Sequence, residues 1–573
     1  MRETIAAGLA RLGVKRMLLA IHDVSFPSDP DEDVGRGSPV TRAAGRLFTY
    51  ARELGFTGVQ LGPQGQTAAD NPSPYDGTIF SRNLGNISLG SLRAGGAFEG
   101  LVSEDVLDAA LVTAGGNARH RHAHAAMQTI VTAAHASLQR GARPDLAAHL
   151  AHFRVEHAAW LERDALYAAL CASYGGRSFR DWPDQGGDPA QHTDAMDRYA
   201  LGQLLVHEEH SRLRSRLHGT ELALYGDMQV GYSDGDAWAH AATFMRGYRM
   251  GAPPSRTNPE GQPWGYPVLD PAQYDGAARA LVVARAEKLF AEYDSLRIDH
   301  PHGLICPWVY LDEGDPALSV RAGARLFESP DLPDHPRLAP FAIARPDQLD
   351  RAQPRYADRW MTSLDRAQVD QFATLFAALV EAAERNLRSA SDLSCEVLST
   401  MPFPLEKVLA LYNLGRWRIT QKANLASPDD VYRSESAQRQ DWVMLGNHDT
   451  APIFALVATW SPQQRELWAR HLTQRLHLRE PERCSDDGFL ATAMLAELFV
   501  SRAENVSIFF ADLFGYHERF NVPGLVDDAN WTLRLPSDFE TLHRDRLARG
   551  AALDLPLAIE LALLAQEHGA ERR

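Results

Sequence analysis

Eight short apolar runs, separated by stretches of helical periodicity, constrain the fold of this 573-residue chain more than any other feature. Each run is rich in aliphatic or aromatic residues and ends near a glycine or a polar residue, the pattern of a buried parallel strand. The runs are 15–22, 58–61, 222–227, 295–300, 393–398, 417–420, 441–446 and 506–510, and the apolar pattern is thinnest at 417–420. Alternating strands and helices predict an α/β fold of the (β/α)8 TIM-barrel class.

Two segments are too long for ordinary crossovers between neighbouring strands. Residues from approximately 71 to 218 and from approximately 301 to 390 are mostly helical in pattern. We therefore expect a single barrel over 1–573 with two inserted, mainly helical subdomains. Only helical pattern follows Trp531, so no C-terminal β-sandwich domain is expected.

The composition is that of a globular protein, with 45% hydrophobic and 23% charged residues. A net charge of −16 opposes binding to nucleic acid or to an anionic membrane. No apolar run approaches the length of a membrane span, and an early acidic residue makes the start unlike a secretory signal, so a cytoplasmic location is expected. The four scattered cysteines are expected to be reduced thiols.

Acidic residues lie at or just after the ends of three of the apolar runs. In Ser295-Leu-Arg-Ile-Asp-His300, Arg297 and Asp299 project to the same face, so Arg297 is expected to keep Asp299 ionised. The alternative is an internal ion pair that only closes a strand of the barrel. Glu396 lies late in the fifth run and Asp449 follows the seventh. The C-terminal ends of barrel strands share one mouth, where active sites lie.

The segment His120-Arg-His-Ala-His124 is the one histidine cluster that suggests a metal site. On a helix only His120 and His124 share a face, and no further ligands accompany them. We therefore expect neither a metal nor another cofactor.

The order of the three acids along the chain is that of the alpha-amylase superfamily. Within it, the chain resembles the amylomaltase (4-alpha-glucanotransferase, disproportionating enzyme) family, and the missing β-sandwich favours that branch. Arg297-Ile-Asp-His300 is identical to the family motif. The other similar segments, in chain order, are Ser73-Pro-Tyr75 with Asn86, Gly226-Asp227 through Asp236-Ala-Trp238, Gly251-Ala-Pro-Pro254 through Gly261-Gln-Pro-Trp-Gly-Tyr-Pro267, Arg519-Phe-Asn-Val-Pro-Gly524, and Asn530-Trp531.

This resemblance implies retaining glycoside chemistry, with Asp299 as the nucleophile, Glu396 as the acid and base, and Asp449 as the transition-state stabiliser. Because Cys395 and Val397 flank Glu396, we expect an apolar setting that raises its pKa. Sugar rings stack on aromatic side chains. The expected substrate-binding residues are Arg297, His300, His448, Asn447, Tyr75 and Trp264.

The implied activity is transfer of alpha-1,4-glucan segments between maltooligosaccharides, as in starch or glycogen metabolism. The expected partners are an alpha-1,4-glucan donor and a sugar acceptor, either glucose or a maltooligosaccharide, with no nucleic acid and no membrane. The oligomeric state is left open. Two alternatives remain: an alpha-glucan hydrolase that uses water as acceptor, and a non-catalytic glucan-binding barrel, against which the three retained acids argue.

The sequence departs from the family pattern beside each acid. It has His300-Pro-His-Gly-Leu304 for His-Phe-Arg-Gly-Phe, Glu396-Val-Leu-Ser399 for Glu-Asp-Leu-Gly, and Gly446-Asn-His-Asp-Thr-Ala-Pro452 for Gly-Thr-His-Asp-Asn-Asp-Thr. Ser255-Arg-Thr257 stands where aromatic residues are usual. We expect a changed acceptor or chain-length preference with the core reaction kept, and loss of activity is the alternative.

Overall fold

An eight-stranded parallel sheet forms the centre of the computed structural model, which describes residues 2–112, 116–183, 187–256, 258–525 and 527–571. The strand order is β10-β11-β12-β1-β2-β3-β6-β9. The strands are β1 (Arg16–Ala20), β2 (Gly58–Gln60), β3 (Ala223–Met228), β6 (Ser295–Ile298), β9 (Leu393–Cys395), β10 (Trp417–Ile419), β11 (Trp442–Met444) and β12 (Asn505–Phe509). Every predicted strand is confirmed, including the thin run at 417–420.

The two end strands, β9 and β10, meet and nearly close the sheet into a barrel. Trp417 donates its backbone N–H to the carbonyl of Val397 at 3.2 Å, and its indole Nε1–H to Ser394 Oγ at 2.7 Å. Closure leaves few strand edges exposed to water. The predicted (β/α)8 class is therefore confirmed.

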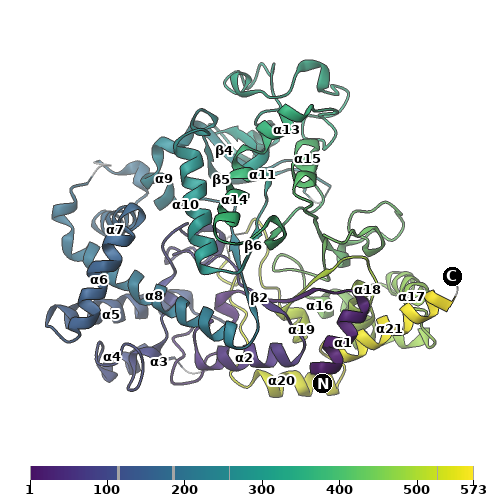
Figure 1. Cartoon of the computed structure of the whole chain (residues 1–573), viewed down its shortest axis with the longest axis horizontal. Coiled ribbons are helices and arrows are strands. Elements are labelled where there is room, and N and C mark those ends of the chain that lie inside the picture. Colours follow the sequence, from purple (N-terminus) through teal and green to yellow (C-terminus); the bar gives the residue numbers. More distant parts are fainter. Residues whose placement is uncertain (1, 113–115, 184–186, 257, 526, 572–573) are drawn as a thin grey trace.

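Helices cover the outside of the barrel (Figure 1). In α2 (Arg42–Glu53) the buried residues Ala44, Leu47, Phe48 and Ala51 recur at helical spacing and form one apolar face. Thr41 caps the N-terminus of this helix: its side-chain Oγ1 accepts the backbone N–H of Ala44 at 3.1 Å. The helix α18 (Asp487–Phe499) is buried on almost every side, which explains its mostly apolar sequence. Strands covered in this way are buried on both faces and lack hydrophobic alternation.

The helices between β2 and β3 form a lobe beside the barrel, on the left in Figure 1. They are α3 (Leu89–Leu92), α4 (Glu104–Ala110), α5 (His120–Gln139), α6 (Pro144–Glu156), α7 (Ala158–Ser173) and α8 (Thr193–Gly219). The lobe contacts the barrel mouth through α5, where His120 Nε2 lies 2.8 Å from the carbonyl oxygen of Trp531. The division of the chain into domains stays a prediction.

A second, antiparallel sheet lies outside the barrel, in the upper part of Figure 1, and sequence reasoning assigned none of its strands. Its order is β5-β4-β7-β8, with β4 (Phe244–Ala252), β5 (Gln262–Leu269), β7 (Trp308–Leu311) and β8 (Ala324–Arg325). Two of the paired strands lie far apart in the chain, so local pattern does not reveal the pairing. Helices α11 (His302–Ile305), α12 (Pro316–Arg321), α13 (Arg366–Phe372) and α14 (Thr374–Arg385) complete the segment before β9.

The two terminal helices, α1 (Arg2–Leu12) and α21 (Leu555–Glu571), pack against each other (Figure 1). Between Trp531 and α21 the described chain adds one more helix, α20 (Phe539–Ala548), and no β-sandwich, as predicted. None of the helices in the described part of the chain is long and apolar enough to span a membrane.

The contact between Ser394 and Trp417 gives a test of barrel closure. Replacing Ser394 by Ala leaves the buried indole N–H without an acceptor, which should lower the free energy of unfolding by about 1–3 kcal/mol. Equilibrium unfolding in urea measures this change. Ser391→Ala, in the exposed turn before β9, is the control and should change stability by less than about 0.5 kcal/mol. Equal stability of the two variants would contradict the role given to this bond.

Candidate active site

The C-terminal ends of three neighbouring strands bring the polar residues of the site together. In the parallel register, Arg297 of β6 lies opposite Asp227 of β3 and Ser394 of β9. Asp299 directly follows β6 and Glu396 directly follows β9. The backbone N–H of Glu396 donates to the carbonyl of Ile298 at 3.0 Å, so the sheet fixes the distance between the two acidic residues.

The Arg297 guanidinium, 1% exposed, lies among three carboxylates. Its Nη1 is 2.6 Å from both oxygens of Asp227. Its Nη2 is 3.0 Å from Asp299 Oδ1 and 2.6 Å from Glu396 Oε2. The ion pair expected between Arg297 and Asp299 is present, and the same cation also holds two further acids that the sequence did not connect with it.

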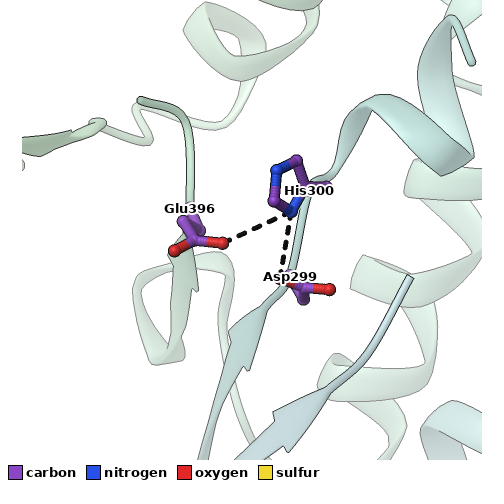
Figure 2. A group of neighbouring side chains, drawn as sticks. All are labelled: Asp299, His300 and Glu396. Atoms are coloured by element: carbon purple, nitrogen blue, oxygen red, sulfur yellow. Dashed lines mark hydrogen bonds and ion pairs between the residues drawn. The ribbon is translucent and has the colours of Figure 1, made fainter. Parts of the chain in front are cut away.

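The His300 ring lies between Asp299 and Glu396, as Figure 2 shows. Its Nδ1 is 3.0 Å from Asp299 Oδ1 and 3.4 Å from Glu396 Oε2. Burial opposes a charge on the ring, but the Asp299 carboxylate outweighs it and raises the pKa of His300 to about 9. The imidazole is therefore cationic at neutral pH. The backbone of His300 has a φ of 41°, a left-handed conformation that is costly for a residue with a side chain and is held here by its surroundings.

Asp299 is buried, and burial alone would raise its pKa. The positive charges of His300 and Arg297 outweigh this effect and hold the pKa of Asp299 well below its usual range. Asp299 Oδ2 also accepts the backbone N–H of Val230 at 3.1 Å. The carboxylate is therefore ionised and fixed in direction.

The surroundings of Glu396 differ from the apolar setting that its chain neighbours suggested. Its side chain is 2% exposed, yet Oε2 contacts the Arg297 guanidinium and the His300 ring. Successive side chains along a strand point to opposite sides, so Cys395 and Val397 do not surround the carboxyl group of Glu396. Arg297 of the adjacent strand β6, and His300 just after that strand, contact it instead.

The loop after β11 carries Asn447, His448 and Asp449. Asp449 Oδ1 accepts the amide N–H of Asn521 at 2.7 Å, and Asp449 Oδ2 lies 3.5 Å from His448 Nε2. Asn447 Oδ1 accepts the backbone N–H of Asp449 at 3.1 Å. The Asp449 side chain is 34% exposed, which leaves carboxylate oxygen free for a ligand.

The two predicted aromatic platforms lie beside these polar groups. The Tyr75 ring stacks on the His448 ring, with centroids 5.2 Å apart and an interplanar angle of 22°. Trp264, from β5, meets His300 edge to face at 5.0 Å. Both aromatic side chains are therefore placed at the mouth of the barrel rather than in its core.

A cleft of about 690 Å³ joins these residues into one surface. Arg297 and Glu396 are buried in contact with Asp299, behind the lining of the cleft. The predicted residues that line it are Tyr75, Trp264, Asp299, His300, Asn447, His448 and Asp449. A cleft of this size, mostly preformed and with a few convergent polar groups, is typical of a small-ligand site.

Asn521 and Lys422 are among the polar residues of the cleft that sequence reasoning did not assign to the site. Asn521 holds Asp449, and it lies inside the segment Arg519-Phe-Asn-Val-Pro-Gly524, so the resemblance contained a signal for it. Lys422 also lines the cleft, where burial lowers its pKa and the negative charges of Asp449 and Glu396 oppose this effect. Lys422 follows β10, the strand with the weakest sequence pattern.

Asp299, His300 and Glu396 also form the type of cluster that binds metals, since their potential ligand atoms lie within 4.8 Å of one another. A metal requires a neutral imidazole, whereas the pKa of His300 is raised to about 9. Arg297 already contacts both carboxylates. The protein itself supplies the positive charge that these donors would take from a metal, so the donor set does not fit one.

The chain is similar to one known protein family and to several curated proteins. A family model for glycoside hydrolase family 77, described as 4-alpha-glucanotransferase, matches residues 21–540. The chloroplastic/amyloplastic 4-alpha-glucanotransferase of Solanum tuberosum is 26% identical over 344 residues, which are 55% of this chain and 57% of that protein. The corresponding protein of Oryza sativa is 28% identical over 185 residues, 29% of this chain and 31% of that protein. The matched regions thus span less than two thirds of these curated relatives.

Solved structures show the same fold. An amylomaltase from Streptococcus agalactiae in complex with acarbose aligns with a TM-score of 0.71 at 17% identity, covering 94% of this chain and 100% of that one. Amylomaltase from Corynebacterium glutamicum aligns with a TM-score of 0.66 at 17% identity, covering 96% and 77%. The family match from residue 21 to residue 540 includes every residue of the cleft named above, and the chain belongs to the 4-alpha-glucanotransferase family.

Proposed function

We propose that this protein is a 4-alpha-glucanotransferase that moves alpha-1,4-glucan segments between maltooligosaccharides by a retaining double displacement. The observation that carries the proposal is the short distance between two buried acids: carboxylate oxygens of Asp299 and Glu396 lie within 4.8 Å of each other. Inverting enzymes place a water between acids about 6.5–9.5 Å apart, whereas retaining enzymes keep them about 5–5.5 Å apart. Family membership and the acarbose complex of the Streptococcus relative support a glucan-type ligand.

In the first displacement, Asp299 attacks the anomeric carbon while Glu396 gives a proton to the leaving oxygen. Asp299 is suited to this role because two cations keep it ionised and a backbone N–H aims it. A proton source is next to Glu396, since protonated His300 lies 3.4 Å from Glu396 Oε2. Asp449 and His448 bind sugar hydroxyls and stabilise the positive charge that develops on the ring.

In the second displacement, Glu396 removes a proton from the acceptor, whose oxygen then attacks the glycosyl-enzyme. Tyr75 and Trp264 present aromatic rings to the cleft and would stack against sugar rings on either side of the bond. The ratio of transfer to hydrolysis then depends on how well the cleft binds a sugar acceptor at the position that water would otherwise occupy.

A hydrolase is the second candidate, because the cleft loop has Ser255 and Arg256 where the family resemblance predicts aromatic residues. Hydrolysis would use the same acids with water as acceptor. A glucan-binding barrel without catalysis is disfavoured, because it has no need for an ionised carboxylate beside a second buried acid. The cytoplasmic location stays a prediction.

The role of Asp299 is tested by Asp299→Asn, which removes the charge and keeps the shape. We expect the turnover of maltotriose to fall by at least about three orders of magnitude, because no other group is placed to form the glycosyl-enzyme. Circular dichroism checks the fold, and Asp370→Asn, in an exposed ion pair on α13, is the control. A folded Asp299→Asn variant with more than about a tenth of the wild-type rate would place the nucleophile elsewhere.

The absence of metal chemistry is tested by removing divalent ions. The positive charges at the site belong to Arg297 and His300, so dialysis against a chelator should leave the rate unchanged. A large loss of activity that one divalent ion restores would contradict this expectation and show that a metal takes part.

The nature of the acceptor is tested with maltotriose as the only substrate. Water is present at about 55 M and a sugar acceptor at millimolar level, so transfer requires a cleft that holds the sugar and excludes water. We expect a ladder of longer oligosaccharides with little increase in reducing ends, together with some hydrolysis. One new reducing end for each bond broken, without longer products, would identify a hydrolase. No products from any alpha-glucan would identify a binding protein.

A further inference from the structure

Arg256 attaches the loop between β4 and β5 to a segment of the barrel. Ser255 and Asn258 of this loop line the cleft, whereas the Arg256 side chain contacts residues that do not line it. Arg256 Nη1 donates to Asp430 Oδ2 at 2.5 Å, and its guanidinium carbon lies 5.6 Å from the centre of the Tyr432 ring. Thr257, the other end of the changed segment, lies outside the described residues. Arg256 thus joins the cleft loop to the segment between β10 and β11.

The segment that receives Arg256 is firmly held. The Asp430 side chain is 1% exposed, and its Oδ1 accepts the backbone N–H of Tyr432 at 2.9 Å. Arg418 of β10 donates to the carbonyl of Val431. A carboxylate buried in this way needs a cation, so Asp430 favours the position of the loop in which Arg256 reaches it.

Tyr432 extends the connection to the acid and base. The Ser399 side chain lies close enough to the Tyr432 hydroxyl to oppose the rise that burial causes in the pKa of Tyr432. Ser399 lines the cleft three residues after Glu396. Arg256 and Ser399 belong to two of the segments in which the sequence departs from the family pattern, and both contact Tyr432. The two changes, far apart in the sequence, are therefore linked in the structure.

We propose that Arg256, Asp430 and Tyr432 form a latch that holds the β4–β5 loop against the wall of the cleft beside Glu396, and so sets how the glycosyl-enzyme divides between a sugar acceptor and water. This inference rests on the proposed transferase function. Glu396 must meet both the leaving group and the acceptor, so the wall beside it bounds the place where the acceptor binds. A loop held against that wall retains an oriented sugar and limits the entry of water.

The latch is tested by Arg256→Met, which keeps most of the length of the side chain and removes its charge. With maltotriose as substrate, we expect the ratio of hydrolysis to transfer to rise about two- to fivefold, the range that a half-exposed ion pair supplies. Arg256→Lys keeps the charge and should give an intermediate ratio. Arg366→Met removes an arginine from an exposed ion pair with Asp370 on α13 and is the matched control, with the wild-type ratio expected.

Two further measurements identify the latch itself. Asp430→Asn should raise the ratio as Arg256→Met does, and the double variant Arg256→Met/Asp430→Asn should be no worse than either, because both remove the same ion pair. Hydrogen exchange of the peptide 253–261 should be faster in Arg256→Met than in the wild type and unchanged in Arg366→Met.

The possible results separate the latch from the proposed function. A wild-type enzyme that transfers, with the same product ratio in Arg256→Met, overturns the latch and leaves the transferase in place. If the wild-type enzyme only hydrolyses its substrate, the proposed transferase function is wrong. The proposed effect of the latch on the product ratio is then wrong as well. Unchanged hydrogen exchange of 253–261 in Arg256→Met overturns the latch whatever the acceptor is.

Discussion

The buried guanidinium of Arg297 is the interaction on which the rest of the site depends. It lies at the centre of the barrel mouth in contact with Asp227, Asp299 and Glu396, which come from three adjacent strands. Three carboxylates buried together without a cation would repel one another and lose their hydration. Arg297 therefore allows the acids to lie close enough to act on one bond. Protonated His300 adds a second positive charge on the side of the cleft.

The charged and polar residues at the ends of the barrel strands form the floor of the cleft. Segments that lie far away in the sequence form its walls. Tyr75 comes from the chain after β2, Trp264 from the antiparallel hairpin, and Asn521 from the region after β12. Each wall contacts the floor through a specific pair: Tyr75 stacks on His448, Trp264 meets His300, and Asn521 holds Asp449. Such a division lets the walls vary in sequence while the chemistry of the floor is kept.

This division also gives the departures from the family pattern a physical meaning. The Arg297, Asp299 and Glu396 contacts are made within the sheet, where a shift of one residue would disrupt the register. The changed residues Arg256 and Ser399 lie in loops, where a new side chain can form a new contact without disturbing the barrel. They meet at Tyr432, so the loop changes are not independent of each other.

The sequence by itself determined the eight strands, because buried parallel strands need continuous apolar runs, and it placed Asp299 and Glu396 at the mouth because they follow such runs. The resemblance added the functional roles and the aromatic residues. Only the tertiary structure decided the surroundings of Glu396, since the residues beside a strand-end acid belong to the adjacent strand and not to its chain neighbours. The antiparallel sheet and the contacts of Arg256 with Asp430 likewise join residues far apart in the chain. Local patterns record burial and periodicity, whereas the pairing of polar groups depends on which distant segments the fold brings together.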